Sequence, residues 1–196
     1  MHPIHGDDPD SSFREILNRF IAGDADRAHA QGLAAWRAGH LEQARMLLAN
    51  AAMADPDKLA IPRDLAKILW AAGETEQALK LLDSLPPEVR LEPDIAPLYA
   101  HLSLAETART APPVTELQTQ LDAHPEDLQT RYQLAAALLA ADDFEGALEA
   151  LLYITKHDRS FRHDIGRVSM LALFELLGAQ HPATRKFRPL LSESLH

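Results

Sequence analysis

The chain has 196 residues, of which 46% are apolar and 24% charged, as in an ordinary soluble globular domain. It has no cysteine, which excludes disulfides, thiolate zinc sites, thiol redox chemistry and a cysteine nucleophile within this chain. The formal net charge of −10 argues against nucleic acid as a partner, because the phosphates would be repelled.

No segment of the sequence predicts export or insertion into a membrane. The longest apolar run, residues 134–141, is about half the length that spans a bilayer. The first eight residues lack a basic region followed by an apolar stretch, so we expect no secretory signal and a cytoplasmic location.

The charge is unevenly distributed along the chain. Residues 1–149 carry 12 basic and 25 acidic side chains, whereas residues 150–196 carry 7 basic and 4 acidic ones. One explanation is a solvated surface with chance clustering. The other is a basic end that docks on an acidic partner.

The N-terminal part predicts a tail followed by a short helix. Residues 1–11 are polar, with prolines at positions 3 and 9, and predict a flexible tail or interdomain linker. Residues 13–21 have apolar side chains at helical spacing, and Ser12 with Glu15 forms a capping box. We therefore expect a separate leading helix that covers the first repeat.

A sequence repeat of 34 residues follows. The segment from Ala38 to Leu48 returns as Ala72 to Leu82, and a looser copy lies at residues 141–151. This period is typical of stacked helix–turn–helix units of the tetratricopeptide type. The first unit predicts helices at 24–38 and 41–54, and the second predicts helices at 59–72 and 75–85.

The rest of the chain departs from the period and then partly returns to it. Prolines at positions 93, 97, 112 and 113 interrupt residues 91–125, which nevertheless keep helical spacing and predict one degenerate repeat. A clear unit follows at 127–158, after which an apolar helix is expected at 165–177 and a final helix at 182–195. Repeats are thus expected at about 24–57, 58–90, 91–125 and 127–158, within a domain over 12–196 whose C-terminal helices span 163–195.

The pattern predicts an all-α, tetratricopeptide-type α-solenoid of antiparallel helix pairs, with a leading helix and C-terminal capping helices. Small residues are expected where the two helices of a unit cross closely. They are Gly32 with Ala44 and Ala51, Ala66 with Ala78, and Ala135 with Ala147.

Several segments of the C-terminal half carry a narrower resemblance. They are His124 to Ala135, Phe144 to Leu152, Asp158-Arg159-Ser160-Phe161, Phe174 to Gly178 with His181-Pro182, and Lys186-Phe187-Arg188. Together they resemble the C-terminal tetratricopeptide domain of the YbbN (CnoX) proteins, and the resemblance extends over about residues 12–196. In that bacterial family a thioredoxin-like domain precedes the repeats, and the protein is a stress-linked holdase and co-chaperone.

The resemblance implies a non-catalytic domain without cofactor, which binds unfolded clients and docks on the GroEL chaperonin or the DnaK system. The thioredoxin-like domain is absent from this sequence, so the chain is either a fragment that begins in the interdomain linker or a stand-alone relative. We favour the fragment. Two rivals are a generic tetratricopeptide scaffold for another bacterial complex and an α-helical enzyme, for which no motif is present.

Repeat position predicts a peptide-binding groove on the first helices of the units. Trp36 and Trp70 are 34 residues apart and occupy equivalent positions, where they either grip a peptide or pack between units. Asp26, Asp64 and Ala136 are also expected to line the groove. The predicted groove residues are His29, Leu33, Trp36, Arg37, Arg63, Lys67, Trp70, Gln129, Tyr132 and Gln133.

The last helix is a second predicted interaction site. Its basic residues alternate with apolar ones, and the resemblance implicates this end of the chain in docking on the chaperonin. The alternative is a capping helix with solvated charges. The predicted docking residues are Arg185, Lys186, Phe187, Arg188, Leu191 and Leu195. The ten histidines lack metal-ligand spacing, so we expect no metal site.

Overall fold

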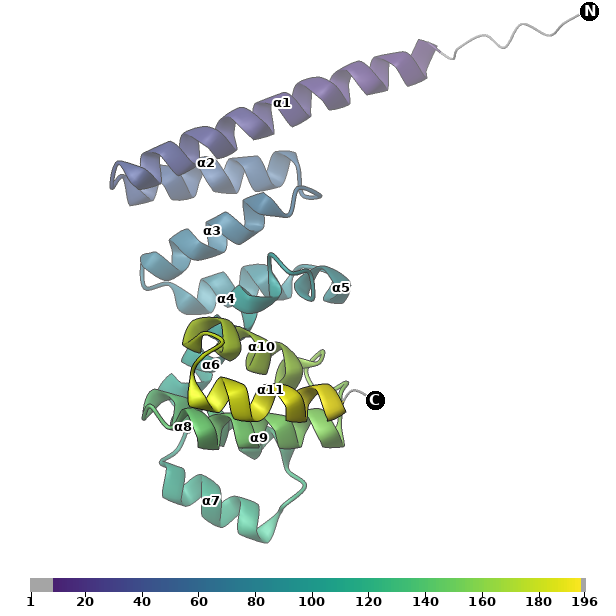
Figure 1. Cartoon of the computed structure of the whole chain (residues 1–196). Coiled ribbons are helices and arrows are strands. Elements are labelled where there is room, and N and C mark those ends of the chain that lie inside the picture. Colours follow the sequence, from purple (N-terminus) through teal and green to yellow (C-terminus); the bar gives the residue numbers. More distant parts are fainter. Residues whose placement is uncertain (1–8, 195–196) are drawn as a thin grey trace, which may run out of the picture. The chain divides into compact units, whose positions relative to one another are not determined.

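The computed structural model describes the backbone of residues 9–194 and the side chains of residues 23–194. Within this part of the chain there are eleven helices and no strand, as the all-α prediction requires (Figure 1). The helices form two compact units. Unit 1 extends to Glu74 and unit 2 begins at Thr75.

Unit 1 contains α1 (Pro9–Arg37), α2 (Leu41–Ala54) and α3 (Ala60–Ala71). α1 and α2 form a closely packed pair, and α3 packs on α2 and touches α1. Gly39 turns the chain between the pair with a φ of 81°, a left-handed value that glycine adopts without strain. A Cβ atom on Gly32 would lie 2.8 Å from Cγ of Leu48, which confirms the close crossing expected at this glycine.

The predicted break between a leading helix at 13–21 and a second helix from residue 24 is wrong. The structure has one continuous helix, α1, over these residues. Only Gly23 could mark the break, and a glycine inside a helix costs about 1 kcal/mol relative to alanine, which does not end it. Residues 9–11 of the predicted tail are also helical, while residues 1–8 lie outside the described part of the chain.

Unit 2 is built around the antiparallel pair α8 (Leu128–Ala140) and α9 (Phe144–His157). Aspartates begin both helices. Asp127 accepts hydrogen bonds from the backbone N–H groups of Gln129 and Thr130, at 2.9 and 3.1 Å, and Asp143 accepts one from Gly146 at 2.9 Å. These acids therefore cap helices, and their place in the sequence has a structural explanation.

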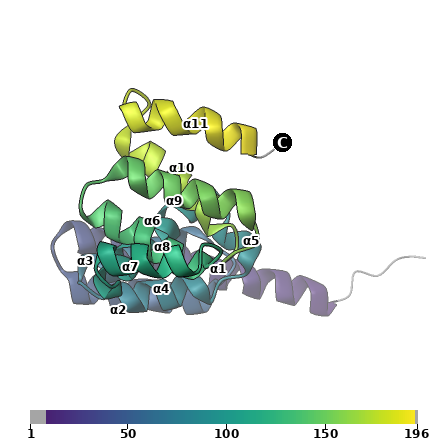
Figure 2. The same ribbon diagram turned by 90° about the horizontal axis from the view of Figure 1, so that it is seen from below.

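Several other helices of unit 2 pack on this pair. α6 (Ala96–Thr110) packs on α8, on α10 (Ile165–Leu177) and on α4 (Thr75–Asp83), and the short α5 is Pro87–Arg90. α11 (Pro182–Ser194) packs on α9 and α10 and is the outermost helix of the group in Figure 2. The largest fully buried side chains here are those of Tyr132 and Phe174.

The degenerate interval 91–125 is helical, but its two helices do not form the expected pair. α7 (Val114–Ala123) packs on α8, where Leu117 and Leu121 meet Leu134, whereas α6 packs elsewhere in the unit. The chain between α6 and α7 is extended at Ala111 and continues through two prolines. Proline disfavours a helical conformation in the residue before it, so this connection cannot be the tight turn of a helix pair.

Candidate protein-binding surfaces

Unit 1 carries seven of the predicted groove residues on two of its helices. They follow one another at helical spacing on each helix, and we call the surface they form the A-helix face: His29, Leu33, Trp36 and Arg37 on α1, and Arg63, Lys67 and Trp70 on α3. Trp70 is 41% exposed, Arg37 is exposed, and the other five are half-buried. The face therefore combines accessible aromatic surface with cationic groups.

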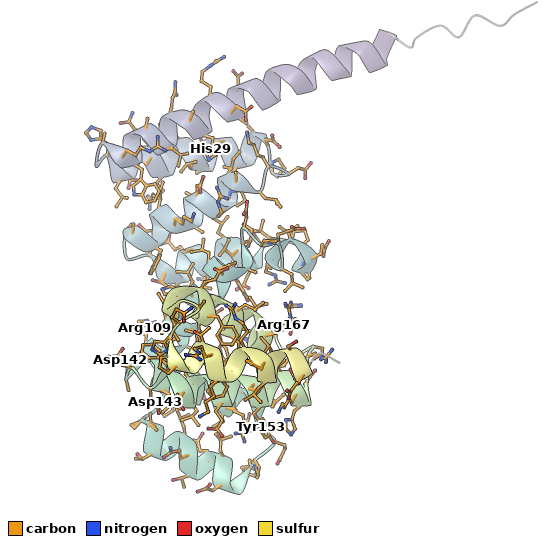
Figure 3. The ribbon with its side chains drawn as sticks, in the orientation of Figure 1. His29, Arg109, Asp142, Asp143, Tyr153 and Arg167 are labelled. Carbon is orange, nitrogen blue, oxygen red and sulfur yellow. The ribbon has the colours of Figure 1, made fainter. Side chains whose placement is uncertain are left out.

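Asp64 organises the cationic side chains of this face. Its carboxylate is buried and lies 2.9 Å from Nε2 of His29, which comes from α1 (Figure 3). Nε of Arg63 donates to the same carboxylate at 3.1 Å, and Nζ of Lys67 lies 3.8 Å away. The aspartate thus holds three predicted groove residues together and links α1 to α3.

The charge state of Asp64 follows from this environment. Burial alone would raise the pKa of its carboxyl group, because a charge is costly away from water. Hydrogen bonds from Arg63 and His29, and the charges of Arg63 and Lys67, outweigh burial and lower the pKa below its ordinary value. The carboxylate therefore stays ionised at neutral pH.

Asp26, the other acidic residue expected at the groove, lies on α1 and pairs with Lys58 in the same unit.

The predicted groove residues on α8 have a different environment. Gln129 is exposed and Gln133 half-buried, but Tyr132 is fully buried. Burial raises the pKa of the Tyr132 phenol to about 12. Tyr132 is a core residue and cannot line an open groove, so its assignment to the peptide surface is wrong; Ala136 is buried as well. The Tyr132 side chain lies near Ser103 of α6 and Ser169 of α10, which repeat position alone does not reveal.

A strained loop packs against Tyr132. Arg162, His163 and Asp164 have φ values of 45°, 56° and 64°, and each such residue other than glycine costs about 1 kcal/mol or more. The guanidinium group of Arg162 lies 4.9 Å from the centre of the Tyr132 ring, and Asp164 pairs with Arg167. These contacts oppose the strain and fix the start of α10.

The C-terminal helix α11 is a packed helix rather than a free docking segment. Phe187 and Leu191 are buried, Lys186 pairs with Glu145 of α9 at 2.6 Å, and the guanidinium group of Arg188 lies 5.5 Å from the centre of the Phe174 ring. Arg185 is exposed, and Leu195 lies outside the described residues. The assignment of Phe187 and Leu191 to a docking surface is wrong, because they belong to the core.

The exposed apolar surface in this part of unit 2 is on α10 instead. Leu171 and Leu176 are 43% and 62% exposed. The sequence contained a signal for this exposed apolar surface, since a helix that is apolar on all sides must either be enclosed or expose part of its apolar surface.

Within the described residues, no three histidine, aspartate or glutamate side chains are grouped to hold a metal ion. None of the helices described is long and apolar enough to cross a membrane.

Comparison with known proteins identifies the repeats. Two family models, each described as tetratricopeptide repeat, match residues 35–102 and 107–196. No curated protein matches the chain. A domain of protein VP0806 of unknown function, from Vibrio parahaemolyticus, is 22% identical, with 87% of this chain and 99% of that chain covered and a TM-score of 0.39. A mutant of MamA is 17% identical, with coverages of 87% and 95% and a TM-score of 0.37.

The chain therefore carries a tetratricopeptide-repeat domain, and the predicted fold class, an all-α helical-repeat solenoid, is confirmed. Domains of this kind are scaffolds for interactions between proteins. Membership of the YbbN family, and the boundaries of the individual repeats, stay predictions.

Proposed function

We propose that this chain is the non-catalytic, client-binding module of a cytoplasmic, thioredoxin-like co-chaperone, and that clients bind to the A-helix face of unit 1. The observation that supports this most is the composition of that face. Trp70 and Trp36 offer aromatic surface beside Arg37 and Lys67, on two helices linked through the buried Asp64.

The physical properties of these side chains suit transient recognition of unfolded segments. A tryptophan that is 41% exposed still has apolar area to bury, and aromatic residues contribute strongly to binding energy at protein interfaces. The cations favour segments that carry acidic residues next to apolar ones. The Asp64 cluster holds the two helices together, so little ordering is needed when a client binds.

The binding step can be tested with one labelled probe. We expect reduced, alkylated and fluorescein-labelled α-lactalbumin, which is permanently unfolded, to bind the chain in a fluorescence anisotropy titration. Replacing the aromatic surface in Trp70→Ala should raise the Kd by about 5-fold or more, because truncated aromatic residues at an interface cost above 1 kcal/mol. Failure of the unmodified chain to bind would contradict the proposal.

The control is Met53→Ala in the same unit. Met53 is 83% exposed on α2, so its truncation removes accessible apolar surface that belongs to neither α1 nor α3. This variant should keep the original Kd. Equal weakening by both variants would show that general surface hydrophobicity, and not the A-helix face, captures the probe.

The co-chaperone role has a separate test, because it rests on the sequence resemblance. A pulldown from bacterial lysate with the full chain should recover chaperonin or a DnaK-type chaperone together with unfolded clients. Recovery of neither would contradict the co-chaperone role. A discrete set of other proteins in their place would favour the generic scaffold.

A further inference from the structure

Helix α10 has a ridge of side chains on its exposed side. Ile165, Met170 and Phe174 are buried in unit 2, whereas Arg167, Leu171 and Glu175 follow one another at a spacing of four residues. Residues at this spacing form one row along a helix. Leu171 at the centre of the row is 43% exposed and Glu175 is exposed.

A hollow lies on each side of this row. One, of about 240 Å³, separates α10 from the segment that leads into α6 and from the first turn of α6, and it is lined there by Leu91, Pro93 and Pro97. The other, of about 430 Å³, separates α10 from α11 and is lined there by Arg188, Leu191 and Ser192. Leu171 and Glu175 line both hollows, so the row is a ridge between two grooves.

A helix ridge flanked by grooves has the shape that packs against another such ridge. When two helices meet through their rows at a spacing of four, each ridge enters a groove of the other, and the axes cross at about 50°. A single groove would show only that the partner has a convex surface. The ridge with grooves on both sides is complementary to a second surface of the same form.

We propose that this surface binds a second copy of the chain, in a two-fold dimer with the two α10 helices antiparallel. Along the ridge the order is a cation at Arg167, an apolar side chain at Leu171 and an anion at Glu175. The antiparallel arrangement sets Leu171 against Leu171 at the axis and Arg167 of each copy towards Glu175 of the other. A two-fold interface uses the same patch on both subunits, and this order satisfies that condition.

The charges select this arrangement over the alternatives. A parallel pair of α10 helices would oppose Arg167 to Arg167 and Glu175 to Glu175, which is repulsive. A partner segment that is acidic throughout would be repelled by Glu175. A partner segment that is basic throughout would be repelled by Arg167 and Arg188. Arg167 already pairs with Asp164, but a guanidinium group has five N–H donors and can serve a second carboxylate.

The first test is the mass of the full chain in sedimentation velocity and light scattering over a concentration series. We expect a dimer that dissociates on dilution. Leu171→Glu buries a charge at the axis and should raise the dissociation constant at least about 30-fold, as loss of a central interface residue does. The matched control is Met53→Glu on α2 of unit 1, which should leave the dissociation constant unchanged.

The second test exchanges the charges of the ridge. Chains with Arg167→Glu alone or Glu175→Arg alone should each be monomeric, because like charges then face each other. A mixture of the two should form a heterodimer, since every carboxylate of one chain faces a guanidinium group of the other. Melting followed by circular dichroism confirms that each variant is folded, as Arg167→Glu also loses the Asp164 pair.

Three results would overturn the proposal. One is a chain that stays monomeric at every concentration up to about 100 μM. A dissociation constant above that concentration corresponds to a binding free energy weaker than roughly 5.5 kcal/mol. Another is a dimer that persists in Leu171→Glu. The third is a mixture of the two folded charge variants that stays monomeric, which would exclude the antiparallel arrangement even if a dimer exists.

Discussion

The A-helix face of unit 1 and helix α11 of unit 2 look alike in the sequence, since both place aromatic and cationic residues at helical spacing. In unit 1 the aromatic Trp70 stays 41% exposed, and the cations gather around the buried Asp64. In α11 the aromatic Phe187 is buried, and Arg188 lies over the Phe174 ring. The same kind of pattern makes an accessible surface in one unit and a packed one in the other.

The difference shows that a row of aromatic and cationic residues on a helix does not by itself predict whether the row is accessible. Spacing determines which side chains share a side of the helix. Whether that side is covered depends on whether neighbouring helices pack against it, and in α11 the side that carries Phe187 and Leu191 is buried where the helix packs on α9 and α10. The four predictions that follow test this contrast, beginning with the largest expected effect.

Truncation of the buried aromatic of α11 should destabilise unit 2 strongly. We expect Phe187→Ala to lower the free energy of unfolding by about 3–5 kcal/mol, the range for removing a phenylalanine from a core. Urea unfolding followed by circular dichroism at 222 nm measures it. Arg185→Ala, an exposed neighbour on the same helix, should change stability by less than about 0.5 kcal/mol. A similarly small effect of Phe187→Ala would show that α11 is not packed.

Removal of the organising carboxylate should destabilise unit 1. Asp64→Ala removes the buried carboxylate to which His29 and Arg63 are hydrogen-bonded, and we expect a loss of about 2–3 kcal/mol. Both tryptophans of the chain lie in unit 1, so urea unfolding followed by tryptophan fluorescence reports on this unit. The exposed pair of Asp24 with Arg27 supplies the control, because Asp24→Ala should cost well under 1 kcal/mol.

Acid should weaken the same cluster. The folded pKa of Asp64 lies below its ordinary value, so its ionised form stabilises the folded state above about pH 4. This contribution is lost as the pH falls through the folded pKa. We expect the fluorescence-monitored urea midpoint to fall below pH 4 in the unmodified chain and to fall less steeply in Asp64→Asn. Parallel pH profiles for the two proteins would contradict the assignment.

Truncation of the exposed aromatic should have the smallest effect on stability. Trp70→Ala removes a partly solvated side chain, and we expect a loss of about 1 kcal/mol or less, whereas Tyr132→Ala in the core should cost several times as much. Thermal unfolding by circular dichroism compares the two variants directly. Equal losses would mean that Trp70 packs as a core residue and is not available to a client.

Most of the fold was predictable from local features of the sequence. The repeat at Ala38 and Ala72, the close crossing at Gly32 and the capping acids Asp127 and Asp143 each depend on neighbouring residues in one or two helices. The continuity of α1 is not predictable from spacing alone, because Gly23 at the expected break does not end the helix. The pairing of α7 with α8 was missed because it depends on tertiary packing against Leu134.

The candidate surfaces were only half predictable, for a related reason. Helical spacing alone predicts which residues of the A-helix face share a side of α1 and of α3, but the central role of Asp64 appears only once the two helices meet. Spacing alone predicts that Tyr132 and Phe187 lie on surfaces, yet both side chains are buried against neighbouring helices. The ridge on α10 was hidden within an apolar run, in which Leu171 and Phe174 look equivalent until packing separates them.

Hydrogen exchange of the full chain with and without the unfolded, labelled α-lactalbumin probe tests the central claim most directly. Amides within α1 and α3, around residues 29–37 and 63–70, should gain protection when the probe binds, while those of α8 around Tyr132 should keep their exchange rates. Protection confined to α8 or α11, with α1 and α3 unchanged, would contradict the account.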